Sequence, residues 1–133
     1  MSDRPFVYLD TSVAIAHLLS ETVAPPRELW DEPLVASRLL AHELHTRLRA
    51  RGLQLSHGDA AEQVLGRVST LEVAEPVVDA LNSDVPPGVR TLDALHLASM
   101  LFLRNQGAEV QLASYDRRML AAAEALGFEA YPL

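Results

Sequence analysis

Four acidic residues in this chain fall at positions where their carboxylates could act together. Asp10 follows the short apolar run PFVYL, and Asp116 follows the run EVQLAS after one further residue. Asp93 lies just inside the start of a long apolar helical pattern, RTLDALHLASMLFLRNQG. In open α/β sheets, ligands bind at the carboxyl ends of the strands. We therefore expect these three aspartates near one edge of a sheet.

Glu43 is a fourth candidate because of its place on a helical wheel. Four leucines of residues 36–50 share one arc, and they are Leu39, Leu40, Leu44 and Leu48. Glu43 falls inside this apolar arc, where a solvated glutamate is not expected. A buried carboxylate needs a partner, and Arg47, one turn further on in the same arc, could form a structural ion pair with it.

Each acid also has an ordinary structural interpretation. Asp10 and Asp116 stand where helix N-caps belong, and N-caps favour aspartate. Asp93 lies in the first turn of its helix, where the helix dipole favours a negative charge. These interpretations explain the acids one at a time but not as a group.

A cluster of carboxylates is unfavourable unless something neutralises it. Two unit charges at ~5 Å repel by about 3 kcal/mol at an effective dielectric constant near 20. Oxygen ligands without cysteine suit Mg²⁺ or Mn²⁺. Such ions bind phosphates and activate water for in-line attack on a phosphodiester. If the acids converge, the sequence therefore predicts a divalent-metal site for phosphodiester hydrolysis.

The composition narrows the possible functions. The chain has 133 residues, a net charge of −7, no cysteine, and only arginine among its basic residues. The lack of cysteine excludes thiol nucleophiles and thiolate zinc sites, and the lack of lysine excludes a P-loop, a Schiff-base enzyme and a response-regulator receiver. We expect one domain over residues 1–133. We also expect a cytoplasmic protein with no membrane partner, because the sequence contains no long apolar run and no signal-peptide pattern.

The elements that must position the acids alternate between strand and helix. We expect strands at residues 5–9, 34–37, 70–75, 109–114 and 128–132. Helical patterns lie between them, at residues 11–19, 25–33, 38–52, 56–69, 76–83, 90–107 and 115–127. Short apolar strands alternating with helices predict an α/β fold, with a parallel sheet covered by helices on both faces. The first helix carries more apolar residues than one buried stripe needs, namely Val13, Ile15, Leu18 and Leu19, which suggests a partner or dimer surface there.

Four segments of the chain resemble the PIN-domain ribonucleases, and more narrowly the toxin of a VapBC-type toxin–antitoxin pair. These segments are YLDTSVAIAHL, ASRLLAHELHTRLRAR, TLDALHLAS and LASYDRRMLAAAEALGFEAY. They occur in the family's order and cover essentially the whole chain. A single LDTS would be a weak match, but the four together are specific.

The resemblance implies a three-layer PIN-like domain with a central parallel five-stranded sheet. It implies a Mg²⁺- or Mn²⁺-dependent endoribonuclease whose catalytic and metal-binding acids fall on Asp10, Glu43, Asp93 and Asp116. Small hydroxyl residues often accompany these acids in the family. Here Thr11 or Ser12 stands beside Asp10, and Ser114 stands two residues before Asp116. The implied partners are an RNA substrate, a VapB-type antitoxin and a second copy of the chain.

Three other functions compete with this interpretation. A phosphatase of the haloacid dehalogenase type needs a second aspartate at the position of Ser12 and a lysine, and both are missing. A non-catalytic α/β binding module would use the acids only as caps and ion pairs. A PIN-domain nuclease of RNA processing would keep the chemistry without being a toxin.

Overall fold

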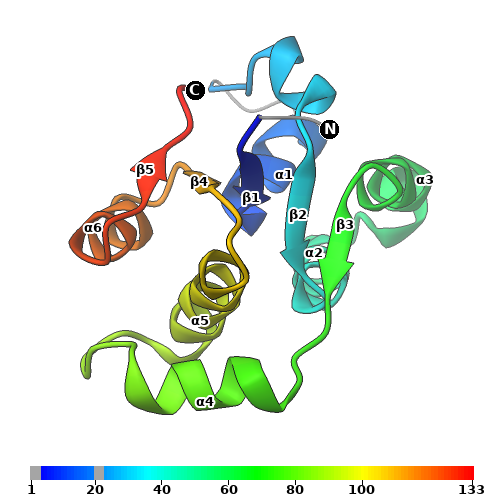
Figure 1. Ribbon diagram of the computed structural model, residues 1–133. Coiled ribbons are helices and arrows are strands. Elements are labelled where there is room, and N and C mark those ends of the chain that lie inside the picture. The colour runs from blue at the N-terminus through cyan, green and yellow to red at the C-terminus, as the bar shows by residue number, and fades with distance from the viewer. Residues whose placement is uncertain (1–3, 20–22) are drawn as a thin grey trace.

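The protein forms a five-stranded sheet in which every strand pair is parallel. The computed structural model describes residues 4–19 and 23–133. The strands are β1 (Phe6–Leu9), β2 (Leu34–Ser37), β3 (Ser69–Leu71), β4 (Val110–Ala113) and β5 (Glu129–Ala130). Their order in the sheet is β3-β2-β1-β4-β5, so the first strand of the chain lies at the centre (Figure 1). The described residues exclude 1–3 and 20–22. Residues 1–3 belong to the N-terminal segment in which no signal peptide is expected.

Within the described part of the chain, six α-helices and one 3₁₀ helix connect the strands. They are α1 (Thr11–Leu18), η1 (Arg27–Asp31), α2 (Leu39–Ala50), α3 (Gln54–Leu65), α4 (Glu75–Ser83), α5 (Thr91–Asn105) and α6 (Arg117–Ala125). Helix α2 ends as expected, because Gly52 just beyond it takes a left-handed φ of 69°. None of the helices in residues 4–19 and 23–133 has the length and hydropathy needed to cross a bilayer.

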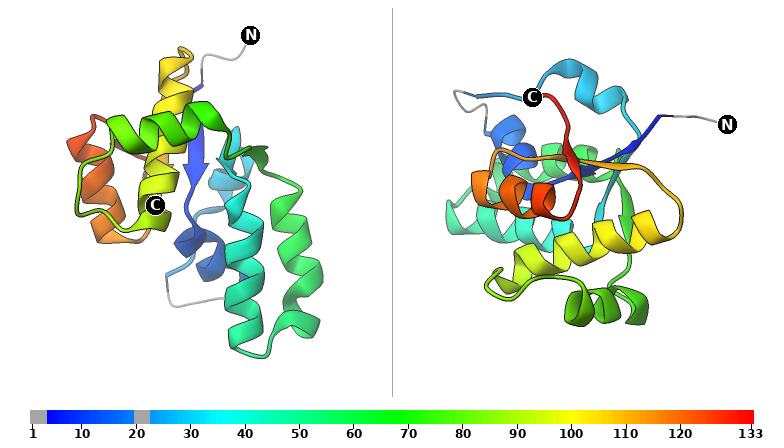
Figure 2. Two further views of the ribbon diagram at one scale, coloured as in Figure 1. Left: turned by 90° about the horizontal axis from the view of Figure 1, so that it is seen from below. Right: turned by 60° about the vertical axis from the view of Figure 1, so that its left-hand side comes forward.

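The alternation of side chains along β1 divides the core in two. Val7 and Leu9 point to one face of the sheet, where they join residues of α1, α2 and α3, and Tyr8 points to the other face, among residues of α4, α5 and α6. The view from below in Figure 2 shows these two groups of helices on opposite sides of β1. The predicted three-layer α/β fold with a parallel five-stranded sheet is confirmed.

The strand order creates a switch point between β1 and β4. The chain first adds strands on one side of β1, and it then crosses to the other side for β4 and β5. Phe6 pairs with Val110 and Leu9 pairs with Ala113, so these two strands end at the same level. In α/β sheets a crevice forms at the carboxyl ends of strands at such a point. Asp10 directly follows β1 there, and the loop of residues 114–116 directly follows β4.

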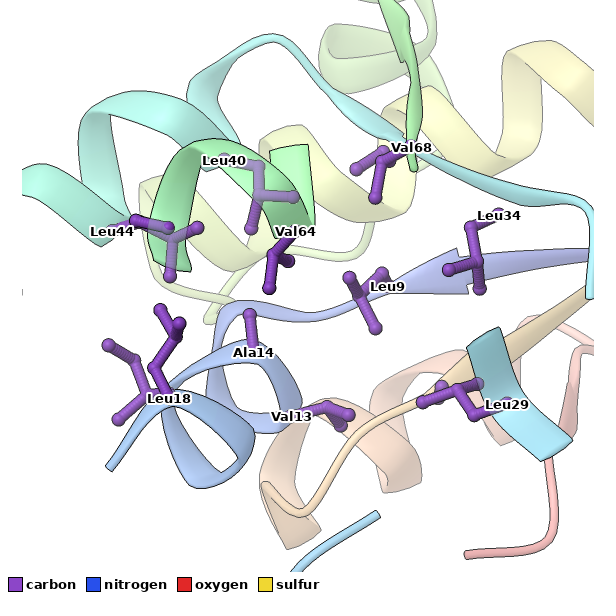
Figure 3. Packing of buried hydrophobic residues seen from close by; sticks show 14 of the residues in the cluster. Leu9, Val13, Ala14, Leu18, Leu29, Leu34, Leu40, Leu44, Val64 and Val68 are labelled. Atoms are coloured by element: carbon purple, nitrogen blue, oxygen red, sulfur yellow. The ribbon is translucent and has the colours of Figure 1, made fainter. Parts of the chain in front are cut away.

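The suggested partner surface on the first helix is wrong. Val13, Ile15 and Leu18 are all buried, and Leu19 is partly buried against the same cluster. Figure 3 shows Val13 and Leu18 within a group of aliphatic side chains that includes Leu29 of η1 and Val64 of α3. Helix α1 is apolar on more than one side because η1 and α3 cover it as well as the sheet.

Several element boundaries differ from the prediction, and strand β5 is the shortest case, because it covers only Glu129–Ala130 of the expected 128–132. Strand β3 covers only Ser69–Leu71, and residues 72–74 continue as irregular chain before α4. Helix α3 begins at Gln54, two residues before the expected start, and ends at Leu65. None of these differences moves a candidate site residue.

Candidate active site

Asp10 is held by two serine hydroxyls instead of capping its helix. It occupies the N-cap position of α1, but its side chain makes no capping hydrogen bond. Its Oδ2 atom accepts hydrogen bonds from Ser12 Oγ at 2.6 Å and from Ser114 Oγ at 2.8 Å. With only 7% of its surface exposed, Asp10 is a buried carboxylate. The two hydroxyls supply the partners that such a group requires.

The same two serines bind the loop between β4 and α6. Ser114 Oγ accepts a hydrogen bond from the backbone N–H of Asp116 at 2.9 Å, and Ser12 Oγ accepts one from the backbone N–H of Tyr115 at 3.0 Å. Each hydroxyl therefore donates to Asp10 and accepts from this loop. We call Ser12 and Ser114 the serine clamp, because together they hold the carboxylate of Asp10 against the segment that carries Asp116.

Asp116 is a helix cap, as its ordinary interpretation predicts. Its Oδ1 atom accepts from the backbone N–H groups of Arg118 at 2.9 Å and Met119 at 3.3 Å, at the start of α6. A carboxylate can accept more hydrogen bonds than these two, and its side chain is only half-buried. Capping therefore orients Asp116 at the sheet edge without using its full capacity to bind a ligand.

Asp93 lies close enough to the other aspartates to be affected by their charge. It occupies the first turn of α5 and is half-buried. Burial raises the pKa of its carboxyl, and the negative charges of Asp116 and Asp10 raise this pKa further. The three aspartates expected at one edge thus act on one another electrostatically, although they come from three separate parts of the chain.

Glu43 is paired with His96, not with Arg47. Its Oε1 atom lies 2.7 Å from His96 Nε2, and the glutamate side chain is only 12% exposed. Arg47 is exposed and contributes only a weak favourable charge to Glu43. The helical wheel correctly placed Glu43 at the boundary of the core, but the proposed ion-pair partner is wrong because the arginine side chain reaches solvent instead.

The pKa values of this pair reflect their contact. Burial alone would raise the pKa of Glu43, but the hydrogen bond and charge of His96 lower it below its ordinary value. Burial alone would lower the pKa of His96, but the hydrogen bond and charge of Glu43 raise it above its ordinary value. Each partner therefore favours the charged form of the other.

The hydroxyl of Thr11 faces this pair without a hydrogen bond of normal geometry. Among the described residues, Thr11 Oγ1 is a buried side-chain oxygen that has no hydrogen-bond partner. It is nevertheless near enough to Glu43 to lower the pKa of that carboxyl. Of the two hydroxyls beside Asp10, Ser12 is therefore the one that binds it, and Thr11 lies next to Glu43 with an unused polar atom.

Two hollows containing arginines flank the acids, and both reach the start of α6. One has a volume of about 410 Å³ and is lined by Arg47 and Arg51 together with Asp116. The other, of about 160 Å³, is lined by Arg90 and Arg118 together with Asp93. The chain is acidic overall, but these hollows place cationic side chains beside the carboxylates. This arrangement suits a polyanion whose backbone passes across the acids.

The carboxylates do not form a closed metal site. Within residues 4–19 and 23–133, no three acidic or histidine side chains are arranged so that they could hold a metal ion. Two observations still fit a hydrated divalent ion. The unused Thr11 oxygen beside Glu43 could accept a hydrogen bond from a metal-bound water, and a cation would relieve the charge that Asp10 and Asp116 impose on Asp93.

Tyr8 and Ser37 are the residues of this region that were not singled out from the sequence. The Tyr8 hydroxyl lies 2.6 Å from His96 Nδ1 and accepts a hydrogen bond from the backbone N–H of Ser37 at 3.0 Å. One signal was present in the sequence. A tyrosine inside a short buried strand needs a partner for its hydroxyl, and a histidine on a buried helix is a suitable one.

Comparison with known proteins identifies the family of this chain. The model of the family described as PIN domain matches residues 7–125. Ribonuclease VapC46 of Mycobacterium tuberculosis (strain ATCC 25618 / H37Rv) is 35% identical over 125 residues, which cover 91% of this chain and 92% of the relative. Ribonuclease VapC47 of the same species (strain CDC 1551 / Oshkosh) is 29% identical over 129 residues, covering 92% and 93%. Ribonuclease VapC35 from that strain is 28% identical over 128 residues, covering 90% and 91%. The chain therefore belongs to the PIN domain family.

Proposed function

We propose that this protein is a metal-dependent endoribonuclease and the toxin of a type II toxin–antitoxin pair. The observation that carries the proposal is the convergence of acids where β1 and β4 end: Asp10 and Asp116 follow these paired strands, and Asp93 lies near enough for their charges to raise the pKa of its carboxyl. The relatives that are named ribonucleases, and that align over nearly the whole chain, support the same activity.

The four acids divide into two kinds of environment. Asp10 and Glu43 are held by neighbouring side chains, the serine clamp and His96 respectively. Asp93 and Asp116 are half-buried at the edge of the hollows. Asp10 and Glu43 would provide fixed ligand oxygens, and Asp93 and the uncapped oxygen of Asp116 would adjust to the substrate. This division suits a site that binds a metal ion on its own and closes fully around it when RNA is present.

Mg²⁺ or Mn²⁺ is the proposed cofactor, with Asp10, Glu43, Asp93 and Asp116 as its ligands, directly or through water. When bound, such an ion activates water and stabilises charge on the phosphodiester. The chain itself orients the ligand oxygens and supplies Thr11 Oγ1 as an acceptor for a water molecule beside Glu43. The arginines of the two hollows would hold the phosphates on either side of the scissile bond.

The proposed partners follow from the same chemistry. Single-stranded RNA fits best, because a folded duplex would not bring one phosphodiester down to acids that are buried or half-buried. A VapB-type antitoxin would inhibit the enzyme by covering the acidic edge. A homodimer and a cytoplasmic location complete the proposal.

Cleavage of total RNA by the purified, partner-free protein tests this function. Reactions would contain Mg²⁺, Mn²⁺ or EDTA, and would compare wild type with Asp93→Asn. Glu124→Gln is the matched control, because it removes one negative charge from an exposed residue of α6, about 12 Å along the helix from Asp116. We expect discrete fragments from wild type and from the control, and none from Asp93→Asn or in EDTA.

Other outcomes would support a different function. Cleavage that is equal in Asp93→Asn would indicate a contaminating nuclease. A complete lack of cleavage, together with a lack of Mn²⁺ binding, would favour the non-catalytic binding module. If RNA is cleaved but a small antitoxin encoded by the adjacent gene does not inhibit the cleavage, a PIN nuclease of RNA processing is favoured.

A further inference from the structure

A chain of buried polar groups connects the centre of the sheet to Glu43. It runs from the Ser37 backbone N–H through the Tyr8 hydroxyl and the His96 imidazole to the Glu43 carboxylate, with distances of 3.0, 2.6 and 2.7 Å. Its four residues come from β2, β1, α5 and α2. Tyr8 and Ser37 are fully buried, and His96 is 1% exposed. The chain is therefore a part of the core that ends at the candidate site.

We propose that His96 is a positioning residue, which holds Glu43 at the acidic edge, and that Tyr8 fixes the imidazole for this task. The inference rests on the proposed function, because it assigns a role to Glu43 within that site. It adds two residues, His96 and Tyr8, that never touch metal or RNA in this assignment. Their effect reaches the site only through the carboxylate of Glu43.

The proton on His96 Nε2 follows from the partners of Tyr8. One lone pair of the Tyr8 oxygen accepts the Ser37 N–H, and burial raises the pKa of the phenol, so the hydroxyl keeps its proton. The hydroxyl can donate a hydrogen bond to Nδ1 of a neutral imidazole. The hydrogen of the ring is then on Nε2. If the imidazole is charged, both nitrogens carry hydrogen. In either state Nε2 donates to Glu43.

The position of the ring is fixed by packing as well as by hydrogen bonds. The rings of Tyr8 and His96 meet edge to face, with centroids 5.6 Å apart and an angle of 71° between their planes. Tyr8 itself lies in the central strand, which pairs with both β2 and β4. Glu43, in the second turn of α2, is thereby connected through His96 to the central strand of the sheet.

This geometry determines which oxygen of Glu43 is available. Oε1 already accepts a hydrogen bond from His96, so the second oxygen, Oε2, is the one that can coordinate a metal ion or accept a hydrogen bond from its water. A glutamate has three rotatable bonds and would otherwise sample many positions, so a ligand that immobilises it costs conformational entropy. Holding one oxygen reduces this cost before the metal ion arrives. Partners of metal ligands are typically worth 10- to 100-fold in metal affinity or activity.

Two substitutions of one residue separate positioning from simple packing. In His96→Gln, the amide nitrogen can lie near the place of Nε2 and still donate to Glu43. In His96→Asn, the shorter side chain cannot reach that far. Both variants lose the ring and its contact with Tyr8, so we expect a similar loss of thermal stability from each. The glutamine keeps a donor for Glu43 and the asparagine does not, so Mn²⁺ affinity is the property in which the two variants should differ most.

The experiment measures Mn²⁺ affinity by calorimetry without RNA, the melting temperature by circular dichroism, and RNA cleavage. We expect His96→Gln to stay within about threefold of wild type in Mn²⁺ affinity, and His96→Asn to bind at least about tenfold more weakly. Tyr8→Phe should fall between them, because the imidazole remains but loses its orienting hydroxyl. In a Glu43→Gln background, His96→Asn should cause no further loss of Mn²⁺ affinity.

The failures of the two proposals are distinguishable. If wild type binds Mn²⁺ and cleaves RNA, but the glutamine and asparagine variants are equally affected, His96 is only a packing residue and the positioning role is wrong. A further loss from His96→Asn in the Glu43→Gln background would overturn it as well. If wild type neither binds Mn²⁺ nor cleaves RNA, the proposed function itself fails, and the positioning role with it.

Discussion

Replacing Ser114 with alanine should destabilise the protein strongly for such a small change. The buried hydroxyl donates to the Asp10 carboxylate and accepts the backbone N–H of Asp116. A hydrogen bond to a charged group is worth about 1.5–3 kcal/mol, and an unsatisfied buried N–H costs about 1–3 kcal/mol. Because a water molecule can partly replace each of these hydrogen bonds, we expect the free energy of unfolding to fall by about 2–4 kcal/mol. For a domain of this size, that corresponds to a fall in melting temperature of roughly 8–15 °C.

Thermal unfolding at neutral pH, followed by circular dichroism, measures this loss. Ser56→Ala is the matched control, because it removes the same hydroxyl from an exposed position of α3. It should change the free energy of unfolding by no more than about 0.5 kcal/mol. RNA cleavage by Ser114→Ala, measured well below its melting temperature, should also fall, since Asp10 and the Asp116 loop lose a shared support. If Ser114→Ala melts within 1 °C or so of the control, the serine clamp contributes little and this reasoning is wrong.

Three further predictions concern the acids and the arginines. Asp93→Asn should reduce RNA cleavage at least about 100-fold. It should melt no lower than wild type, because burial and two nearby acids already raise the pKa of Asp93 and so disfavour its charged form. A clear drop in melting temperature would show that the carboxylate is structural. The Glu43–His96 pair should stabilise the fold most between the ordinary pKa values of 4.5 and 6.5. The lowered pKa of Glu43 means that its contribution is lost as the pH falls below that window, and the raised pKa of His96 means that its contribution is lost as the pH rises above it. Urea unfolding across this range should therefore show a flatter pH profile for Glu43→Gln, and an unchanged profile would contradict the assignment. Arg51→Gln should reduce the slope of log K for RNA binding against log salt concentration by about 0.7, because one phosphate contact is lost. Arg49→Gln is the control, because Arg49 does not line the 410 Å³ hollow, and it should leave this slope unchanged.

The sheet and its acids could be predicted because they depend on local signals. Strand β2 was expected at residues 34–37 and covers those residues, since its four apolar or small side chains are bounded by Pro33 and a helix start. The positions of Asp10 and Asp116 follow from where two strands end. Because all the strands are parallel, their carboxyl ends lie along one edge of the sheet, and the pairing of β1 with β4 then makes these two acids neighbours.

The partners of the acids could not be predicted, because they depend on contacts between distant segments. Arg47 is one helical turn from Glu43 and was the natural local choice, but His96, 53 residues away, is the actual partner. The wheel of α2 shows which side of the helix faces inward, and it carries no information about α5. The same limit applies to α1, where burial by η1 and α3 was mistaken for a surface that needs a partner.

The order of events during synthesis follows from the central place of β1. The two sides of the serine clamp are far apart in sequence: Ser114 Oγ bonds Asp10 across 104 residues, and Ser12 Oγ bonds the Tyr115 N–H across 103. Strand β4, which sets the second side, pairs with β1 only after most of the chain has left the ribosome. A nascent chain that stops before residue 110 has Asp10 and Glu43 but neither the loop that holds Asp10 nor Asp116. In a protein with the proposed toxic activity, interrupted translation would therefore release harmless fragments, and the complete site would arise only in finished molecules.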